Sequence, residues 1–312
     1  SPDKRWLYDL RLSLDTFTNR FTGTITHDHA HFTPTSFVAQ RAELIEHLSG
    51  YYTGLLRPVE PQATDDTYPQ GAAFSSARVS DNGSVIFAGR LADGAVLTAS
   101  TASGYFGQAP LHLLLYNGLG SFQGTLLIQR TTEFFENDYN ILGGTFSWLK
   151  KPNPSPKETG YAAGIPLHDL QMLGFRYFPP VEGSIVLALD PLDSNAQITF
   201  EEAKIGDSSM DPDSILTIDS SHQALFPAVN DTGLKLKLDP ATGMFSGDFT
   251  LKDPDPLSPL KMVSRKASFA GVLIPRLDAG FGNFQLPQLR TVPNKLPPTL
   301  SGNLVLEKPV EE

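Results

Sequence analysis

The chain has 312 residues, of which 40% are hydrophobic, and this is enough to build the core of one large or two modest domains. It carries a formal net charge of −10 without a basic patch, which argues against nucleic acid or an anionic membrane as the main partner. It contains no Cys, which excludes disulfides, thiolate metal sites and cysteine nucleophiles, and no apolar run is long enough to predict membrane insertion.

The N-terminal region is predicted to form short strands. Residues 7–15 alternate leucine with polar side chains, and residues 21–26 are the expected return strand of a hairpin. Residues 37–48 have partly helical spacing, but a short strand and a turn fit the surrounding strands better. Residues 51–57 are expected to form a strand, and a loop rich in Pro and Asp follows.

Residues 73–129 carry the strongest strand signal, because three Asx-Gly pairs lie between apolar runs. The pairs are Asn82-Gly83, Asp93-Gly94 and Asn117-Gly118. Asn-Gly accepts positive φ at little cost, so this chemistry matches the tight turn of a two-residue hairpin and predicts consecutive antiparallel hairpins. Residues 84–91 place Val85 and Phe87 on one face and Ile86 and Ala88 on the other, so we expect partial cover on both sides.

The second half of the chain is predicted to contain another strand series. Residues 131–140 are an expected loop, 142–150 a strand, 151–160 a Pro-rich linker and 161–180 an irregular aromatic segment. The strands predicted next are 184–190, 196–205, 214–218, 234–239, 244–252, 261–274, 280–286 and 300–306. A boundary near Pro179-Pro180 divides the chain into expected domains 1–180 and 181–312.

An internal repeat relates the two halves. Residues 10–26 (LRLSLDTFTNRFTGTIT) match residues 234–250 (LKLKLDPATGMFSGDFT) without a gap. Each copy is expected to be a hairpin whose Phe re-enters the core and whose Gly, two residues later, marks a bulge or a close backbone contact. The sequence therefore predicts an all-β protein of two related antiparallel β-barrel or β-sandwich halves.

Several segments carry a family resemblance. They are FTGTIT, VAQRAEL, GYYTGLL, GSVIFAGRLADGAVLTAS, PLHLLLYNGLGSFQGTLLI and GTFSWLKKP. Together they resemble a β-rich repeat domain of large secreted or cell-surface proteins of Verrucomicrobia-type bacteria, with its LaDGt hairpin, its LY-x-G-x-Gs hairpin and its W-x-Kp strand. The resemblance is weak over residues 161–231, and His112 stands where an aromatic residue is usual. It implies an extracellular or cell-surface location and a repeat architecture, and no established activity.

Two sets of side chains are candidate metal ligands. His27, His29 and His31 can share one face of a strand, where three imidazoles would bind zinc or copper. A solvated hairpin tip is the alternative for these histidines. The acids that would suit calcium are Asp207, Asp211 and Asp213, or Asp253 and Asp255. Solvated turn acids are the alternative for both groups.

No catalytic residue and no cofactor is predicted. Glu133, Glu136 and Asp138 are candidates for the carboxylate pair of a glycoside hydrolase, but nothing in the sequence sets their separation. Ser121 lacks the spacing of a nucleophile elbow. The Gly residues around it are not followed by a helix that would bind phosphate.

Two surfaces are candidate binding sites. Trp148, Tyr139, Tyr161 and Tyr177 would form an aromatic platform for surface glycans or a protein partner, unless they belong to the core. The terminal strands 7–15 and 300–307 would pair with another copy of the chain, unless they close their own sheets.

These features predict a non-catalytic, secreted structural or adhesive module that acts through its surface or by self-association. The alternatives are a carbohydrate-binding module of a secreted enzyme, and a hydrolase whose acids converge only in the fold.

Overall fold

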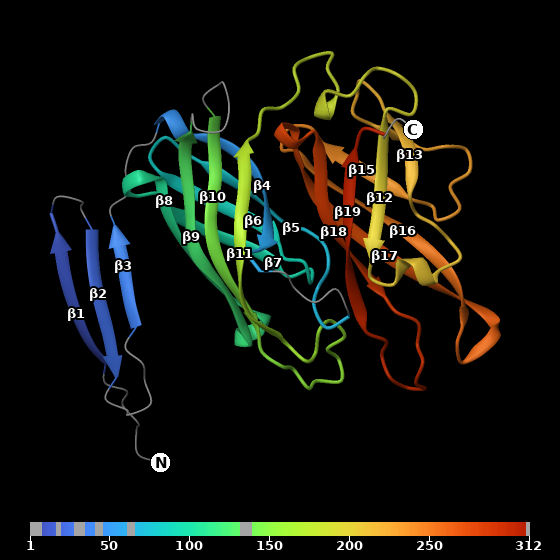
Figure 1. Cartoon of the computed structure of the whole chain (residues 1–312), viewed down its shortest axis with the longest axis horizontal. Helices are drawn as coiled ribbons and strands as arrows, with labels where there is room; N and C mark the ends of the chain where they lie inside the picture. The colour runs from blue at the N-terminus through green and yellow to red at the C-terminus, as the bar shows by residue number, and fades with distance from the viewer. Residues whose placement is uncertain are drawn as a thin grey trace.

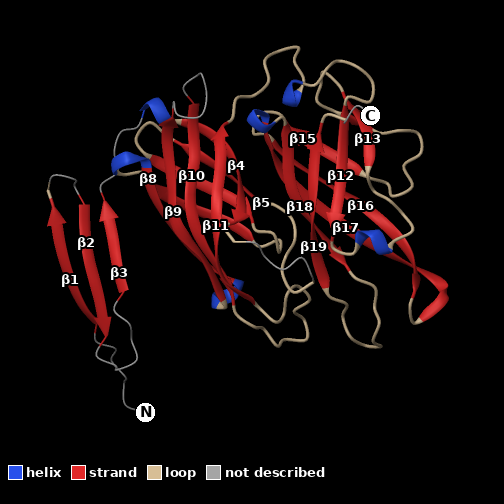
Figure 2. Ribbon diagram, in the orientation of Figure 1, coloured by secondary structure: helices blue, strands red, loops and turns tan. Residues whose placement is uncertain are grey.

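The computed structural model describes residues 8–16, 20–27, 35–40, 46–60, 66–131 and 139–309. Over these residues the chain forms three antiparallel sheets, and its helical segments are short 3-10 turns (Figures 1 and 2). Those turns are η1 (Glu46–Leu48), η2 (Tyr105–Gly107), η3 (Tyr116–Gly118), η4 (Val186–Ala188), η5 (Ile205–Asp207) and η6 (Pro275–Leu277). The all-β class and the two related barrel-like halves are confirmed.

A three-stranded sheet forms first. It contains β1 (Tyr8–Asp15), β2 (Arg20–His27) and β3 (Thr35–Gln40), in the order β1-β2-β3. The predicted hairpin is present, with Leu12 opposite Gly23 and Leu14 opposite Phe21. Neither β1 nor β3 pairs with a strand of the larger sheets in the described chain, and the sheet stands beside the first barrel (Figure 1, blue).

The first barrel is an eight-stranded meander that returns on itself. Its strands are β4 (Gly50–Pro58), β5 (Ala73–Val79), β6 (Ser84–Arg90), β7 (Val96–Ala102), β8 (Gln108–Leu115), β9 (Gly120–Thr131), β10 (Tyr139–Lys150) and β11 (Ile165–Arg176). The first and last strands, β4 and β11, are hydrogen-bonded neighbours, and the sheet order is β7-β6-β5-β4-β11-β10-β9-β8. Its two ends approach each other, since the Thr101 hydroxyl on β7 donates to the Pro110 carbonyl on β8 at 2.8 Å. The barrel is therefore nearly closed.

The second barrel follows the same plan. Its strands are β12 (Ala196–Glu202), β13 (Ser214–Ile218), β14 (Ala224–Leu225), β15 (Lys235–Asp239), β16 (Met244–Asp255), β17 (Ser258–Ile274), β18 (Ala279–Pro287) and β19 (Thr299–Glu307). The order is β14-β13-β12-β19-β18-β17-β16-β15, so the first and last strands again pair in the middle of the sheet. Its core holds Phe200 edge to face against Phe249, Phe269 and Phe284.

Recurrent Phe-x-Gly strands explain how these rings fit. Phe245 and Gly247 on β16 lie opposite Gly271 and Phe269 on β17, so each ring covers the glycine of its neighbour. A Cβ on Gly247 would overlap the Phe269 ring and the Lys235 carbonyl. The close contact predicted at this glycine is confirmed, but there is no bulge, because the register runs unbroken past it. The glycine is needed to make room for an aromatic side chain.

The hairpins of the central stretch are confirmed, but two of their turns differ from the predicted type. At Gly83 and Gly94 the glycine alone has positive φ, 82° and 88°, as in a type I turn followed by a left-handed glycine. The Asn82 and Asp93 side chains accept the N–H two residues ahead, both at 3.0 Å, which holds these residues at negative φ. At the third turn Tyr116, Asn117 and Gly118 all have positive φ.

Three further predictions were wrong. Residues 161–180 were expected to be irregular, yet β11 occupies most of them, because Pro166 and two outward-facing leucines hide its alternation. Residues 184–190 form no strand and carry η4 instead. The strand at 84–91 is covered on one side only, since Ile86 is 56% exposed.

The two barrels pack against each other through a third apolar cluster. Leu55, Phe74 and Phe175 of the first barrel meet Val272 and Ile274 of the second. This contact buries β4 and β5 on both faces, although a barrel strand normally buries only its inner face. Residues 177–195, which include the predicted boundary at 179–180, connect the barrels.

Hydrogen bonds also cross between the barrels. The Thr53 hydroxyl donates to the Leu273 carbonyl at 2.8 Å, and the Asn283 amide donates to the Ala72 carbonyl at 2.9 Å. Asn283 is fully buried, so this bond satisfies a polar group inside the contact. These hydrogen bonds fix the orientation of one barrel relative to the other across an otherwise apolar contact.

Candidate functional site

The predicted metal and carboxylate sites fall largely outside the described residues. His27 ends β2, and its side chain, like all of His29 and His31, is not described. Glu133, Glu136 and Asp138 also lie outside the described residues. Zinc or copper binding at the histidines therefore stays a prediction. Among the described residues no group of three or more metal-ligating side chains is present.

The predicted aromatic platform is wrong for three of its four residues. Trp148 is 0% exposed, and Tyr161 and Tyr177 are also buried. Their polar atoms are used internally: the Tyr177 hydroxyl donates to the Pro240 carbonyl at 2.7 Å, and the Tyr161 hydroxyl bonds Ser301 at 3.0 Å. The Tyr139 side chain is not described. An aromatic residue on a barrel strand joins the core when it lies on the inner face.

Four of the five candidate calcium acids have partners within the chain, and the fifth, Asp207, lies in η5. Asp253 is buried against Arg265, and Asp213 accepts the Phe200 N–H at 2.7 Å. Asp211 accepts the Asp213 N–H at 2.9 Å, and the carboxylate of Asp255 accepts an N–H two residues ahead at 2.9 Å. The alternative role as turn acids therefore fits Asp211 and Asp255, whereas Asp213 bonds a neighbouring strand and Asp253 forms a buried ion pair.

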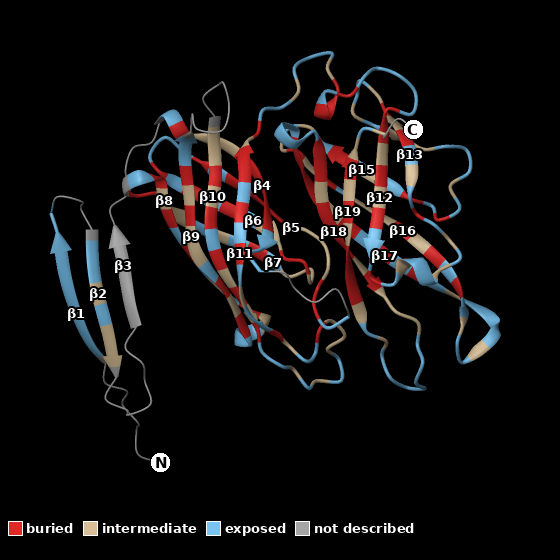
Figure 3. Cartoon of the chain, in the orientation of Figure 1, coloured by how far each residue is buried: buried red, intermediate tan, exposed pale blue. Residues whose placement is uncertain are grey.

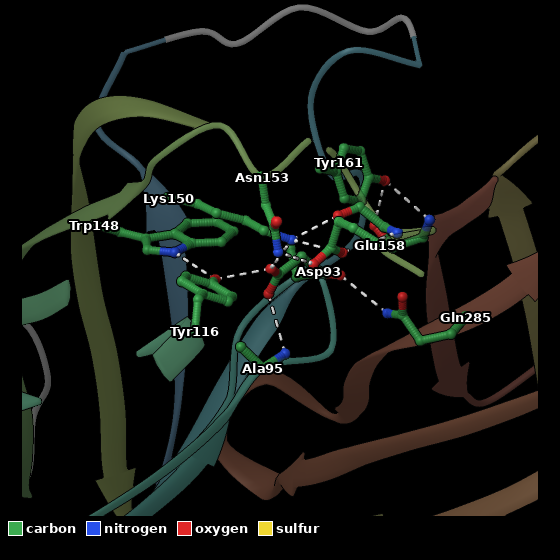
Figure 4. Close-up of polar contacts among 12 residues, drawn as sticks. Asp93, Ala95, Tyr116, Trp148, Lys150, Asn153, Glu158, Tyr161 and Gln285 are labelled. Carbon is green, nitrogen blue, oxygen red and sulfur yellow. Dashed lines mark hydrogen bonds and ion pairs between the residues drawn. The ribbon is translucent and has the colours of Figure 1, made fainter. Parts of the chain in front are cut away.

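The most unusual polar feature is a buried cluster at one end of the first barrel, near the second barrel (Figure 4). Asp93 comes from the β6–β7 turn, Tyr116 from η3, Trp148 and Lys150 from β10, and Glu158 from the loop after β10. The side chains of Asp93 and Lys150 are 3% and 5% exposed. A lysine and an aspartate are almost never this buried unless they are paired.

The Lys150 ammonium has three polar neighbours. Its Nζ lies 3.3 Å from Glu158 Oε1 and 4.0 Å from Asp93 Oδ2, and it donates to the Gly160 carbonyl at 2.5 Å. It also lies over the Tyr116 ring, 4.8 Å from the ring centroid. Two carboxylates, a carbonyl and an aromatic face therefore surround one ammonium group.

The Asp93 carboxylate is held by donors on both oxygens. Oδ1 accepts the Ala95 N–H at 3.0 Å, and Oδ2 accepts the Tyr116 hydroxyl at 2.7 Å. The Trp148 indole donates in turn to the Tyr116 oxygen at 2.9 Å. Burial raises the pKa of the Asp93 carboxyl, and these two hydrogen bonds and the charge of Lys150 act against that rise. Burial also raises the pKa of Tyr116, and the charge of Asp93 adds to the effect.

Glu158 ties its loop to the cluster. Its Oε1 accepts the Gly160 N–H at 3.2 Å, and its Oε2 accepts the Asn153 amide at 3.2 Å. From the second barrel, Gln285 on β18 donates to the Ala92 carbonyl at 3.1 Å, next to Asp93. A cavity of about 460 Å³ opens here, lined by Asp93, Lys150 and Glu158 among others.

The cluster was not predicted, although all of its residues except Glu158 belong to the segments that carry the family resemblance. Asp93 is the acid of the LADG turn, and Trp148 and Lys150 belong to the W-x-K-x-P stretch. In the sequence both stretches carry the family resemblance, which implies no established activity. One feature of the sequence does point to the cluster. Lys150 follows Phe146 and Trp148 at every second position of one strand, so it shares the face of these two core aromatics.

The two predicted terminal strands differ in their neighbours within the described chain. β19 has a hydrogen-bonded neighbour on each side, so of the two possibilities for residues 300–307 the strand closes its own sheet. β1 has β2 on one side and, within the described chain, no strand on the other. Its Leu10, Leu12 and Leu14 are 53%, 57% and 50% exposed (Figure 3).

Comparison of the chain with models of known protein families and with curated proteins finds no match. Within the described residues, no helix has the length and apolar character needed to cross a membrane.

Proposed function

We propose that this protein is a non-catalytic, secreted structural module that associates with further copies of itself through the N-terminal sheet. The observation that carries this proposal is the row of exposed leucines on β1, an edge strand. The two barrels, joined by a shared apolar cluster, form the body that such an assembly would repeat. The secreted or cell-surface location rests on the family resemblance of the segments quoted above.

The exposed leucines of β1 lie on the sheet face that is buried in the other copy of the internal repeat. Leu12 and Leu14 lie opposite Gly23 and Phe21, so these side chains share one face of the sheet. At the equivalent positions of the internal repeat, Leu238 lies opposite Phe245, and both are buried in the second barrel. Pairing with a second copy would set the leucines of the two copies side by side, and each Å² of apolar surface removed from water would contribute about 25 cal/mol.

The charges on β1 suit antiparallel pairing with β1 of a second copy. One register places Leu10 opposite itself and Asp9 opposite Arg11 of the other copy. Another places Leu12 opposite Leu14 and Arg11 opposite Asp15. Both registers keep the leucines on one face, and both form two symmetric pairs of opposite charge around Arg11. Arg11 is therefore the residue on which either register depends.

Light scattering and sedimentation velocity over a range of concentrations test this proposal. The full chain is expected to form particles larger than a monomer, and Arg11→Glu to shift them to monomers, because like charges then face each other. Lys235→Glu makes the same charge change at the equivalent exposed position of the repeat and is expected to behave like the parent chain. A monomer at all concentrations, or an unchanged particle size in Arg11→Glu, contradicts self-association.

A second candidate function is glycan binding at a different place from the predicted platform. A cavity of about 540 Å³ between the barrels is lined by Asn140, Phe175, Arg176 and Phe178, among others. The Arg176 guanidinium lies over the exposed Phe178 ring, 5.2 Å from its centroid. An aromatic face beside hydrogen-bond donors suits a saccharide with an acidic group. Binding on a glycan array that disappears in Phe178→Ala supports this function, and an array without signal contradicts it.

A further inference from the structure

We propose that Lys150 and Asp93 react to form an intramolecular amide bond, with Glu158 as the catalytic acid and base. The bond would join the β6–β7 turn to the end of β10 in a chain that has no Cys for disulfides. This inference is independent of self-association, because it concerns the inside of a single barrel.

The reacting groups are held close together and away from water. Lys150 Nζ lies 4.0 Å from Asp93 Oδ2, and both side chains are almost fully buried. The ammonium is fixed by the Gly160 carbonyl and Glu158, and the carboxylate by Ala95 and Tyr116. Holding two reactants at contact distance removes most of the entropic barrier to their reaction.

The environment favours the uncharged forms that condensation requires. An amine attacks only after it loses its proton, and a carboxyl group loses water only after an oxygen is protonated. Burial raises the pKa of the Asp93 carboxyl, which favours the protonated form that can lose water. Trp148, the Tyr116 ring and Tyr68, whose ring lies 6.4 Å from that of Trp148, provide apolar surroundings.

The reaction balances without any co-reactant. The Lys150 nitrogen attacks Cγ of Asp93, and a C–N bond forms. The Ala95 N–H stabilises the negative charge that develops on Oδ1. One proton passes from the Lys150 ammonium to Oδ2 before the attack, and Glu158, 3.3 Å from Nζ, takes a second proton from the nitrogen and returns it to the same oxygen. The C–Oδ2 bond then breaks, so one ammonium and one carboxylate give one amide and one water.

The released water has a way out. The cavity of about 460 Å³ beside the cluster is lined by the reacting residues and by Gln285 of the second barrel.

The intact mass of the purified full chain, measured after denaturation, tests the proposal directly. A mass lower than that of the sequence by one water is expected, together with a branched peptide that joins Asp93 and Lys150 after proteolysis. The full sequence mass, with both residues in separate peptides, would overturn the proposal whatever the variants do.

Variants test the roles of the individual residues. Lys150→Met is expected to have its full mass, whereas Lys151→Met, at the exposed neighbouring position, is expected to lose water like the parent chain. Glu158→Gln keeps the size of the side chain but cannot shuttle the proton, so its full mass is expected. Asp93→Asn would condense with loss of ammonia instead of water. Loss of water in Lys150→Met would overturn the assignment of the nucleophile.

Discussion

Replacing Asp253 with Ala in the second barrel should destabilise the protein strongly, because it leaves the charge of Arg265 buried without a partner. Asp253 lies on β16 and Arg265 on β17, and their side chains are 3% and 4% exposed. Both Nε and Nη2 of Arg265 lie 2.8 Å from Asp253 Oδ2, and Nη1 donates to the Pro287 carbonyl at 3.4 Å. The variant therefore removes two charge-assisted hydrogen bonds from an enclosed guanidinium.

The expected loss of unfolding free energy is about 3–5 kcal/mol, the range found when one partner of a buried ion pair is removed. The pair itself need not be stabilising, since the cost of taking two charges out of water offsets their attraction. Asp253→Leu combined with Arg265→Met should therefore lie close to the parent chain, or above it by up to about 4 kcal/mol.

Urea unfolding followed by circular dichroism measures both values by linear extrapolation. The same two strands provide a control pair, Asp248 and Lys266, which lie 3.3 Å apart and are far more exposed. Asp248→Ala should cost no more than about 1 kcal/mol. The reasoning fails if Asp253→Ala costs as little as Asp248→Ala, or if the double variant is as unstable as the single one.

Three further predictions concern the barrels and their contact. Gly302→Ala should cost about 1–3 kcal/mol in urea unfolding, because its Cβ would overlap the Phe284 ring; an unchanged midpoint would refute the ring-over-glycine packing. Burial raises the pKa of Tyr52 to about 12, so this residue alone should lower the free energy of unfolding by up to about 3 kcal/mol as the pH rises from 10 to 12, and Tyr52→Phe should remove that part of the slope in urea titrations. Val272→Asp puts a charge into the cluster between the barrels, so calorimetry should show two transitions instead of one; a single transition would mean that other contacts couple the barrels.

The strands were predictable because their signals are local. Alternation along residues 7–15 and the Asx-Gly turns each depend on a few neighbouring residues, and the structure contains those hairpins. β11 was missed because its outward leucines and Pro166 break the same local pattern. The turn types differed for a local reason that residue identity alone does not reveal: the Asp93 carboxylate bonds the Ala95 N–H and stays at negative φ.

The cluster could not be predicted, because its members are distant in sequence. Asp93, Lys150 and Glu158 each have an ordinary local interpretation, as a turn acid, the end of a strand and a loop acid. They meet because β6–β7, β8–β9 and β10 end at the same rim of a closed sheet. The burial of Trp148, which removed the predicted platform, has the same origin, since closure decides which face of β10 is inside.

The amino-acid sequence by itself determined that the chain is all-β, that it is built from antiparallel hairpins and that one hairpin recurs, because these properties follow from periods of two residues and from turn chemistry. Tertiary structure alone decided that both meanders close by pairing their first and last strands, and that the barrels share an apolar contact. It also decided that a lysine and two carboxylates meet out of water. Such contacts join residues tens of positions apart, and closing the sheet fixes them all at once.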